Sequence, residues 1–325
     1  MTGKLISGLH HVTALSSDAR KNLDFYAGIL GLRLVKKTIN FDSPDVYHLY
    51  YGDYEGSPGA LMTFFPYPGI ASGRKGSGQV ITTSFSIPEN SLGYWMKRLD
   101  KFDIIYTKPE QRFGNEEFIY IEDDDGLGIE LVANKIDSRK EFKYGILKPE
   151  FAIKGFFGVT LSIQNHESTS MLLTESMDHE LVLESKGRYR FSPRWNSGGK
   201  GASGSIVDIV SQPTGTKGAG GGGTIHHVAF ATESKDSQLR IRRRLTDAGL
   251  QVTPVIDRQY FQSIYFREPG GVLFEVATLP PGMTVDEDKD SLGEDLKLPP
   301  WYEDDRSEIE LRLGRISLET EKFMD

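Results

Sequence analysis

The hydrophobic and polar positions of this chain repeat one pattern, in which a short β-prone run leads into a helical stretch and then into further strand-like runs. Residues 8–13 (GLHHVT) return near the end of the chain as residues 224–229 (TIHHVA). Weaker copies occupy residues 155–160 and 80–85. Because self-similarity along a sequence marks repeated structural units, we predict four units of one kind.

Helical periodicity follows each of the four opening runs. The expected helices span residues 19–30, 90–99, 167–176 and 239–248. We expect Ser17 or Asp18 to cap the first helix and Asp236 to cap the last, because short polar side chains accept hydrogen bonds from the free N–H groups at a helix start. Strand-like runs follow the helices, as at residues 46–51, 118–122 and 264–267. Each unit is therefore predicted as βαβββ.

The last strand of the unit carries a carboxylate in three of the four copies. These carboxylates are Glu130, Asp208 and Glu275, and Thr63 stands at the corresponding place in the first unit.

The predicted fold class is α+β, with four βαβββ modules in two domains built on curved, barrel-like mixed sheets. The expected domains are residues 1–140 (modules 8–66 and 79–134) and 150–280 (modules 155–212 and 224–278), followed by an acidic tail, 281–325. Gly-rich residues 69–78 and 198–223 fit mobile loops near a site and plain surface connections equally well. Residues 307–313 are expected to form a short helix, to which we assign no chemistry.

A metal site follows from the alternation of side chains along strands. His11 shares a face with Thr13, and the first and last strands of a module lie side by side, so that His227 and Glu275 can meet. His11 is the one other histidine at the equivalent position of a unit. Two imidazoles and one carboxylate make the facial triad of non-haem Fe(II) sites, which leaves coordination positions open.

The other units lack such a set of ligands. Units two and three have a carboxylate without an imidazole, which makes a poor site for a transition metal, and Thr63 supplies no fourth ligand to the first site. Most single histidines are surface or core residues, and Glu275 alone fits an edge-strand carboxylate. Four of the seven histidines, however, form two His-His pairs at equivalent positions, which favours the metal site.

Strand geometry also predicts which residues near these ligands face the metal site. A three-residue loop at 269–271 sets Tyr265 opposite Glu275, although core packing is the alternative for this tyrosine. Arg258 is either a cation that faces an anionic substrate or a solvated surface residue. Simple pleating turns His10 and His226 away from the ligand face, which makes them supporting or core residues.

Composition and charge limit the expected binding partners and cellular location of the chain. The formal charge of −8 argues against non-specific binding to nucleic acid or anionic membranes. The chain has no cysteine, and no apolar run approaches the roughly 18 residues that span a bilayer. Without a signal-like N-terminus, we expect a soluble protein of the cytoplasm that binds neither nucleic acid nor membrane.

These features together resemble the vicinal oxygen chelate superfamily of glyoxalases and extradiol dioxygenases, most closely its hydroquinone-type ring-cleaving dioxygenases. The resemblance rests on residues 8–13, 22–26, 225–230 and 257–275 and extends over essentially the whole chain. It implies two glyoxalase-like domains, Fe(II) as the cofactor (with Mn or Zn possible in a purified sample), and a small aromatic substrate with O2. It also implies a homodimer or larger homo-oligomer.

The resemblance further implies roles for individual residues. The metal ligands are His11, His227 and Glu275, and the residues that assist catalysis are His10, Thr13, His226, Arg258 and Tyr265. For His10 and His226 this conflicts with simple pleating, unless a bulge or twist turns the strand.

Two other functions remain open at this point. A glyoxalase-like isomerase or lyase would need a further ligand carboxylate, which the first unit lacks. A binding protein for quinones or drugs would have no need of the three ligands, which this chain keeps.

Overall fold

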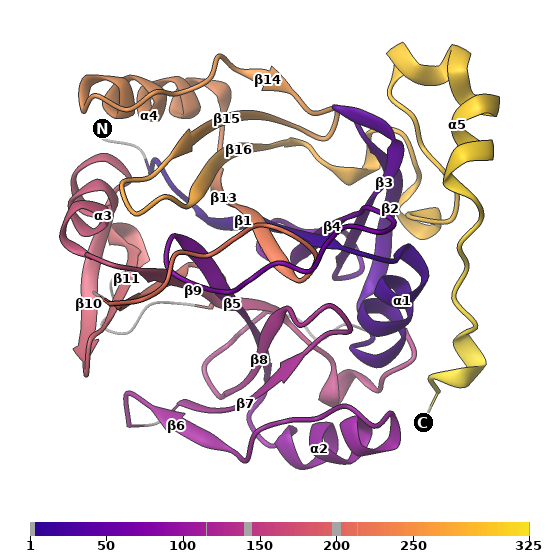
Figure 1. Ribbon diagram of the computed structural model, residues 1–325, viewed down its shortest axis with the longest axis horizontal. Coiled ribbons are helices and arrows are strands. Elements are labelled where there is room, and N and C mark those ends of the chain that lie inside the picture. The colour runs from indigo at the N-terminus through magenta and orange to yellow at the C-terminus, as the bar shows by residue number, and fades with distance from the viewer. Residues whose placement is uncertain (1–3, 115, 140–144, 197–202, 213, 325) are drawn as a thin grey trace.

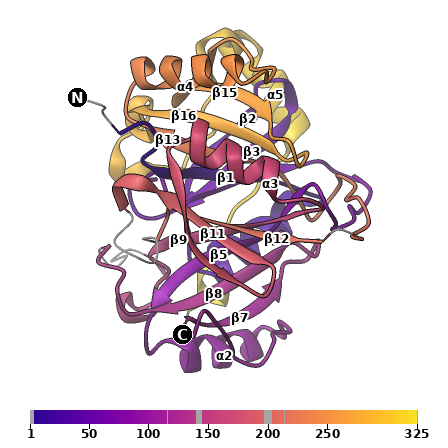
Figure 2. The same ribbon diagram turned by 90° about the vertical axis from the view of Figure 1, so that its left-hand side faces the viewer.

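Two curled eight-stranded mixed sheets form the body of the protein in the computed structural model, which describes residues 4–114, 116–139, 145–196, 203–212 and 214–324. Figure 2 shows the sheets one above the other, with α4 beyond the first sheet and α2 beyond the second. The predicted α+β class with curved mixed sheets is confirmed. Parts of the predicted Gly-rich stretch 198–223 and of the linker between residues 140 and 150 lie outside the described residues.

The first sheet combines the first and the fourth module of the chain (Figure 1). Its strands are, in spatial order, β14 (Ile256–Asp257), β15 (Phe261–Arg267), β16 (Leu273–Pro281), β13 (Thr224–Thr232), β1 (Gly8–Ser16), β4 (Leu61–Pro66), β3 (Ser43–Gly52) and β2 (Arg33–Asn40). Within each module the first strand pairs in parallel with the last, as expected. The two modules join through the antiparallel pair β1–β13.

The second sheet combines the two middle modules in the same manner. Its strands are, in order, β10 (His179–Ser185), β11 (Arg188–Pro193), β12 (Ile206–Ser211), β9 (Gly155–Ile163), β5 (Gln79–Pro88), β8 (Gly128–Asn134), β7 (Glu116–Glu122) and β6 (Glu110–Arg112). Each sheet thus takes one module from each half of the chain. The domain boundaries near residues 140 and 150 stay a prediction, but they do not separate one sheet from the other.

Helices appear where the periodicity predicts them. They are α1 (Ala19–Leu23), α2 (Leu92–Lys101), α3 (Glu167–Met171), α4 (Lys235–Asp247) and α5 (Arg306–Leu313), with π-helical continuations at Asp24–Ile29 and Leu172–Ser176. Short 3-10 turns occupy Pro149–Phe151, Arg194–Asn196, Met283–Val285, Lys289–Ser291, Pro300–Asp305 and Thr320–Lys322. Across the described residues, no helix combines the length and apolar character needed to cross a lipid bilayer.

The structure confirms the predicted N-cap of the first helix but not that of the last. The Asp18 carboxylate accepts hydrogen bonds from the main-chain N–H groups of Arg20 and Lys21, so the predicted cap is confirmed. The cap of α4 is Ser234, whose hydroxyl accepts from the N–H of Ser237. The expectation for Asp236 is therefore wrong, because the helix begins one residue before it and places it in the first turn.

Alternation along the strands sorts the first sheet into an apolar outer face and an inner face. Side chains such as Val12, Tyr51 and Phe64 pack with the α1 segment in the main hydrophobic core, and the ring of Tyr26 lies 4.3 Å from that of Phe64. Their sequence neighbours, His11 among them, point to the inner, concave side. Packing of the outer face therefore leaves the concave face free for a site.

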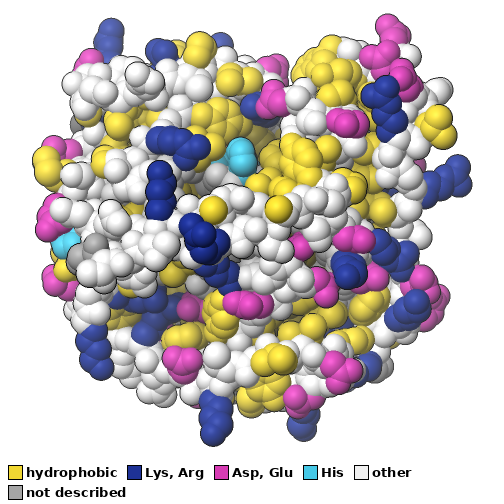
Figure 3. Space-filling model, in the orientation of Figure 1, with side chains coloured by type: hydrophobic (Ala, Val, Ile, Leu, Met, Phe, Trp, Pro, Cys, Tyr) yellow, Lys and Arg dark blue, Asp and Glu magenta, His cyan; other side chains and the backbone are white. Residues whose placement is uncertain are grey.

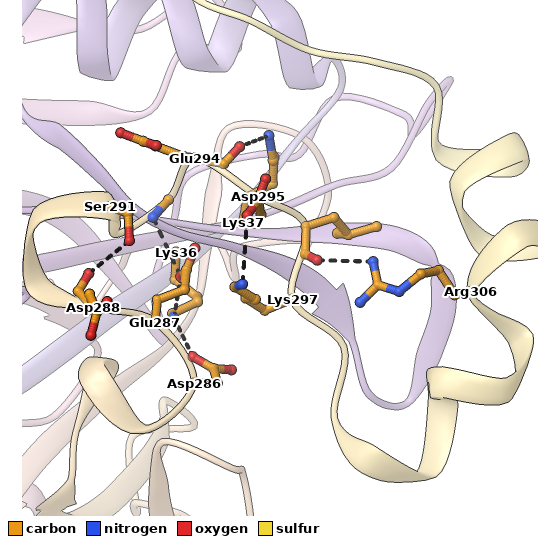
Figure 4. Close-up of polar contacts among 12 residues, drawn as sticks. Lys36, Lys37, Asp286, Glu287, Asp288, Ser291, Glu294, Asp295, Lys297 and Arg306 are labelled. Atoms are coloured by element: carbon orange, nitrogen blue, oxygen red, sulfur yellow. Dashed lines mark hydrogen bonds and ion pairs between the residues drawn. The ribbon is translucent and has the colours of Figure 1, made fainter.

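The acidic tail joins the two ends of the curled first sheet. The Lys36 ammonium on edge strand β2 is fully buried, and it bonds the carboxylates of Asp286, at 2.5 Å, and Glu287 (Figure 4). It also lies 5.0 Å from the ring centre of Tyr260, beside β15 at the other end of the sheet. The Tyr260 hydroxyl donates to Asp286 at 2.9 Å. We call these four residues the clasp.

Main-chain contacts extend the clasp along β2. The Arg33 guanidinium donates to the carbonyl oxygen of Asp290 at 2.8 Å. The Lys37 ammonium donates to the carbonyl of Glu294, and the N–H of Lys297 donates to the carbonyl of Lys37, both at 2.9 Å (Figure 4). The tail therefore covers an edge strand whose free main-chain groups would otherwise invite pairing with another chain.

We predict that Lys36→Met lowers the free energy of unfolding by about 3–5 kcal/mol, because it leaves two neighbouring carboxylates without their buried cation. Urea denaturation measures this loss. Lys37→Met is the matched control on the next position of the same strand. Its ammonium bonds one carbonyl oxygen, so we expect a loss of about 1 kcal/mol. Equal losses in the two variants would contradict the role of the buried charge.

Candidate metal centre

The three predicted ligands meet on the concave face of the first sheet. His11 comes from β1, His227 from β13 and Glu275 from β16, and all three side chains are buried. The Nε2 atoms of the two histidines lie 3.1 Å apart. The Oε2 atom of Glu275 lies 3.2 Å from Nε2 of His11 and 3.0 Å from Nε2 of His227.

The spacing of these three atoms fits a metal with open positions. Bonds of about 2.1 Å at right angles set neighbouring ligand atoms about 3.0 Å apart, whereas tetrahedral angles set them about 3.4 Å apart. The measured triangle matches three adjacent corners of an octahedron. Oε2 of Glu275 is buried and has no hydrogen-bond partner, which is costly unless a cation satisfies it. The donor set therefore fits a divalent transition metal.

Electrostatics keeps the carboxylate of Glu275 ionised. Burial alone would raise its pKa, but the neighbouring imidazoles of His11 and His227 outweigh burial and hold the pKa well below its usual range. The Ser263 hydroxyl donates to Oε1 of Glu275 and leaves Oε2 directed at the two imidazoles.

Two β-bulges in the β1–β13 pair place the second histidine of each pair. The register passes from Leu9–Phe230 directly to His11–Ala229, so His10 is an extra residue, and a second shift leaves His226 without a partner. A bulge turns its strand locally and breaks strict alternation. The Nδ1 atoms of His10 and His11 lie 2.9 Å apart, and those of His226 and His227 lie 2.8 Å apart. Pleating therefore predicted His10 correctly, as a buried residue that supports His11 from outside the cavity, but not His226, which lines the cavity.

These contacts fix the protonation of the ligands. If Nε2 of His11 binds a cation, its Nδ1 atom carries the proton and donates to Nδ1 of His10. Burial and the charge of His11 lower the pKa of His10 to about 3, so His10 is neutral and able to accept. The rings of His10 and His11 also lie 4.9 and 5.0 Å from the ring of Phe261, which holds them in place.

A cavity of about 230 Å³ opens over the triad. Six of its 14 lining residues are phenylalanines and tyrosines: Phe41, Tyr50, Phe65, Tyr67, Phe261 and Tyr265. Figure 3 shows a histidine side chain in a hollow bordered by hydrophobic side chains. His11, His226 and His227 also line the cavity, whereas His10 lies behind them. The space suits one flat apolar ring whose polar group reaches the three ligands.

Tyr265 and Arg258 lie on one side of this cavity. Tyr265 pairs with Glu275 across β15 and β16, which confirms the prediction from the three-residue loop. Burial and the charge of Glu275 raise the pKa of Tyr265, so its hydroxyl stays protonated. Nε of Arg258 donates to the Tyr265 hydroxyl at 3.2 Å, and its Nη1 donates to Asp42 at 3.1 Å. Arg258 is thus a cation of the cavity wall.

Two polar residues of the opposite wall, His48 and Tyr50, are not predicted from the sequence. Both lie on β3 and line the cavity. The hydroxyls of Thr13 and Thr63 lie 2.7 Å apart, and Thr63 also lies 3.0 Å from Nε2 of His48. Aligning the strand at 46–51 with that at 261–267 would have found these residues, because Tyr50 pairs with Thr63 as Tyr265 pairs with Glu275.

The tail also supports the entrance of the cavity. The turn between β2 and β3 contributes Phe41 and Asp42 to the wall. The ring of Phe41 lies 5.5 Å from that of Trp301, and the Tyr302 hydroxyl donates to the carbonyl of Phe41 at 3.2 Å. The same tail that closes the sheet therefore fixes one lip of the cavity.

In the second sheet, arginines occupy the place that a metal would take. Nη1 of Arg112 lies 2.7 Å from the Glu130 carboxylate. Nε and Nη2 of Arg190, which is fully buried, lie 2.7 and 2.9 Å from the Asp208 carboxylate, and Arg188 adds a third contact at 3.0 Å. Within the described residues, His11, His227 and Glu275 are the one group of this kind that could hold a metal, in agreement with the prediction for units two and three.

We predict that Asp208→Asn destabilises the protein by about 3 kcal/mol at pH 7, because the buried Arg190 guanidinium then keeps only Glu116 as a charge partner and Arg188 loses its contact as well. Burial tends to raise the pKa of Asp208, but Arg190 and Arg188 hold it below its usual value. A depressed carboxyl pKa stabilises the fold above the unfolded value of about 3.9 and ceases to do so as the pH falls through the folded value.

The difference in urea midpoint between wild type and Asp208→Asn should therefore persist from pH 7 to about pH 4 and shrink only at lower pH. Asp295→Asn, at an exposed carboxylate 3.7 Å from Lys297, is the control with little effect. A difference that already vanishes between pH 7 and pH 5 would contradict this account of the ion pair.

The fold and the site define the class of protein. Residues 8–131 and 157–276 match the model of the Glyoxalase/Bleomycin resistance protein/Dioxygenase superfamily. These two segments cover well over half of the chain, and it belongs to this superfamily.

Relatives of nearly the same length indicate which enzymes of this superfamily the chain is most similar to in sequence. Chlorohydroquinone/hydroquinone 1,2-dioxygenase of Sphingobium indicum is 32% identical over 94% of this chain and 95% of the relative. MhqO of Bacillus subtilis (strain 168), named as a candidate ring-cleaving dioxygenase, is 43% identical over 94% of this chain and 96% of its own. A crystal structure of a candidate dioxygenase from Bacillus subtilis is 41% identical, with a TM-score of 0.90 over 97% of this chain and 99% of that one. The chain is thus an enzyme, a non-haem metal-dependent dioxygenase.

Proposed function

We propose that this protein is an Fe(II)-dependent, extradiol-type ring-cleaving dioxygenase that acts on hydroquinone- or catechol-like aromatics. The observation that carries the proposal is the buried triad of His11, His227 and Glu275, whose atoms match adjacent corners of an octahedron beneath an aromatic cavity. A metal held by these three residues would keep coordination positions open for a substrate oxygen and O2. The name of the Sphingobium relative supports an aromatic diol as the substrate.

The bound metal would supply a Lewis acid that favours the ionised form of an aromatic hydroxyl and a place where O2 meets the ring. The proposed ligands are His11, His227 and Glu275. Fe(II) is the ion suited to oxygen chemistry at such a triad, although Mn or Zn would bind the same three atoms in a purified sample.

The remaining site residues orient the ligands and the substrate and handle protons at the substrate oxygen. His10 accepts a hydrogen bond from His11 and so orients that ligand. Because Arg258 donates to the oxygen of Tyr265, the proton of Tyr265 is free for a substrate oxygen, and the guanidinium offsets negative charge on it. His226 lies at the cavity mouth, where it can pass protons between substrate and water. Thr13 lies beneath the polar wall opposite Tyr265, where its hydroxyl is hydrogen-bonded to that of Thr63.

The geometry favours this reaction over the two alternatives. An isomerase would need a further ligand, but the Thr63 hydroxyl at that place is engaged by Thr13 and His48. A binding protein would not require three buried ligand atoms at coordination distance from one centre. The homodimer or larger assembly and the cytoplasmic location stay predictions from the sequence.

We expect anaerobically purified, Fe(II)-loaded protein to consume one O2 per molecule of hydroquinone or methylhydroquinone, because both oxygen atoms enter the ring-opened product. An oxygen electrode and the absorbance of the product measure this reaction. His227→Ala should lose at least about 100-fold in rate together with the bound metal. His166→Ala is the control, because His166 stacks on Tyr189 beside the second sheet, with ring centres 3.7 Å apart.

The outcomes separate the metal site from the reaction. Tight binding of one metal without O2 uptake would retain the triad but favour an isomerase or lyase. The absence of metal binding as well as O2 uptake would overturn the metal site itself.

A further inference from the structure

The concave face of the first sheet has a second polar wall that repeats the first. Tyr50 pairs with Thr63 as Tyr265 pairs with Glu275. Two residues earlier on the same strands, His48 bonds Thr63, just as Ser263 bonds Glu275. The two modules thus present equivalent walls to one cavity. The first module replaces the carboxylate with a threonine hydroxyl and the serine with a histidine.

Hydrogen bonds link this second wall into one chain. Thr13 and Thr63 are joined at 2.7 Å, Thr63 and Nε2 of His48 at 3.0 Å, and Nδ1 of His48 and the Tyr50 hydroxyl at 2.9 Å. Thr13, Thr63 and Tyr50 are buried, and the His48 ring is held between the rings of Tyr50, at 4.1 Å, and Phe65, at 4.3 Å. We call these four hydrogen-bonded residues the hydroxyl chain.

The number of protons in the hydroxyl chain limits the directions in which its hydrogen bonds can run. A neutral imidazole donates from one nitrogen and accepts at the other, so His48 either accepts from Thr63 and donates to Tyr50, or donates to Thr63 and accepts from Tyr50. Burial, with the charges of His11 and His227, lowers the pKa of His48 well below its usual value, and burial raises that of Tyr50. The three hydroxyls and the neutral imidazole carry four protons for three hydrogen bonds, so one O–H of the chain always remains free to donate.

One of these hydrogen-bond directions places the free O–H in the cavity wall. Tyr50 lines the cavity, whereas Thr13 lies beneath its surface. If Thr13 donates to Thr63, Thr63 to His48 and His48 to the phenolic oxygen, the free O–H belongs to Tyr50 and faces the cavity. Tyr50 then lies beside the corner that Thr63 leaves open, as Tyr265 lies beside Glu275.

We propose that Tyr50 donates a hydrogen bond to an oxygen of the aromatic substrate, and that His48 is the positioning residue that orients this donor. The inference rests on the proposed function, because it takes an aromatic hydroxyl as the ligand. It makes the site two-sided: Tyr265 and Tyr50 bind oxygen substituents of one ring from equivalent walls. An aromatic diol satisfies both donors, and a simple phenol or an aromatic hydrocarbon does not.

The first test is anaerobic calorimetry of methylhydroquinone binding to Zn-loaded protein, which needs no turnover. We expect Tyr50→Phe and His48→Phe each to weaken binding about tenfold, with metal content and melting temperature unchanged. The double variant should bind no more weakly than either single variant, because both remove the same donor. His166→Phe, at a His-Tyr stack beside the second sheet, is the control without effect.

Side chains of different reach separate the two bonds of His48. An Asn amide lies near the place of Nδ1 and can donate to Tyr50, whereas a Gln amide lies near the place of Nε2 and reaches Thr63. We expect His48→Asn to restore most of the affinity and His48→Gln to restore little. In turnover by Fe(II)-loaded protein, Tyr50→Phe should raise KM about tenfold with a smaller effect on kcat.

Each outcome bears on the inference. Additive losses in the double variant, or rescue by Gln and not by Asn, would overturn the role of His48 toward Tyr50. Unchanged affinity in Tyr50→Phe, or no binding of methylhydroquinone by the wild type, would overturn the role of Tyr50. Binding that depends on Tyr50 without O2 uptake by the Fe(II) form would instead contradict the proposed reaction and support the ligand class.

Discussion

The antiparallel pairing of β1 with β13 is the constraint on which the site depends. It joins strands from opposite ends of the chain and sets the Nε2 atoms of His11 and His227 3.1 Å apart. Parallel pairing of β16 with β13 then adds Glu275. The two bulges of the same pair turn His10 and His226 onto the outer nitrogens of the ligands. One set of main-chain hydrogen bonds thus fixes both the ligands and the residues that orient them.

The two sheets show how one scaffold yields a site in one place and a structural core in another. Both carry carboxylates at the equivalent strand position, but imidazoles face Glu275, whereas guanidinium groups face Glu130 and Asp208. An arginine supplies both the charge and the hydrogen bonds that a buried carboxylate requires. Its long side chain fills the space that remains open above Glu275. Both sheets thus balance their buried carboxylates, the second with arginines and the first with the imidazoles that lie below the cavity.

Closure of the first sheet depends on charge buried away from the site. The sheet is open at β14 and β2, and the clasp of Lys36 with Asp286, Glu287 and Tyr260 joins these ends. Tyr260 adjoins Phe261, whose ring packs against the histidine ligand of β1. The tail therefore stabilises the walls of the cavity without contributing a metal ligand. Its acidic residues have a structural role in closing the sheet.

The sequence by itself determined the four βαβββ units, their helices and the three residues of the triad, because periodicity and repeated spacing are local properties of the chain. It also placed Tyr265, since the length of a hairpin loop sets the register of its strands. It did not determine the pairing of modules across the halves, the bulges at His10 and His226, or the orientation of Arg258. The second wall, with His48 and Tyr50, also emerged only when two distant modules shared a sheet. These features depend on contacts between segments far apart in the sequence, which only the tertiary structure decides.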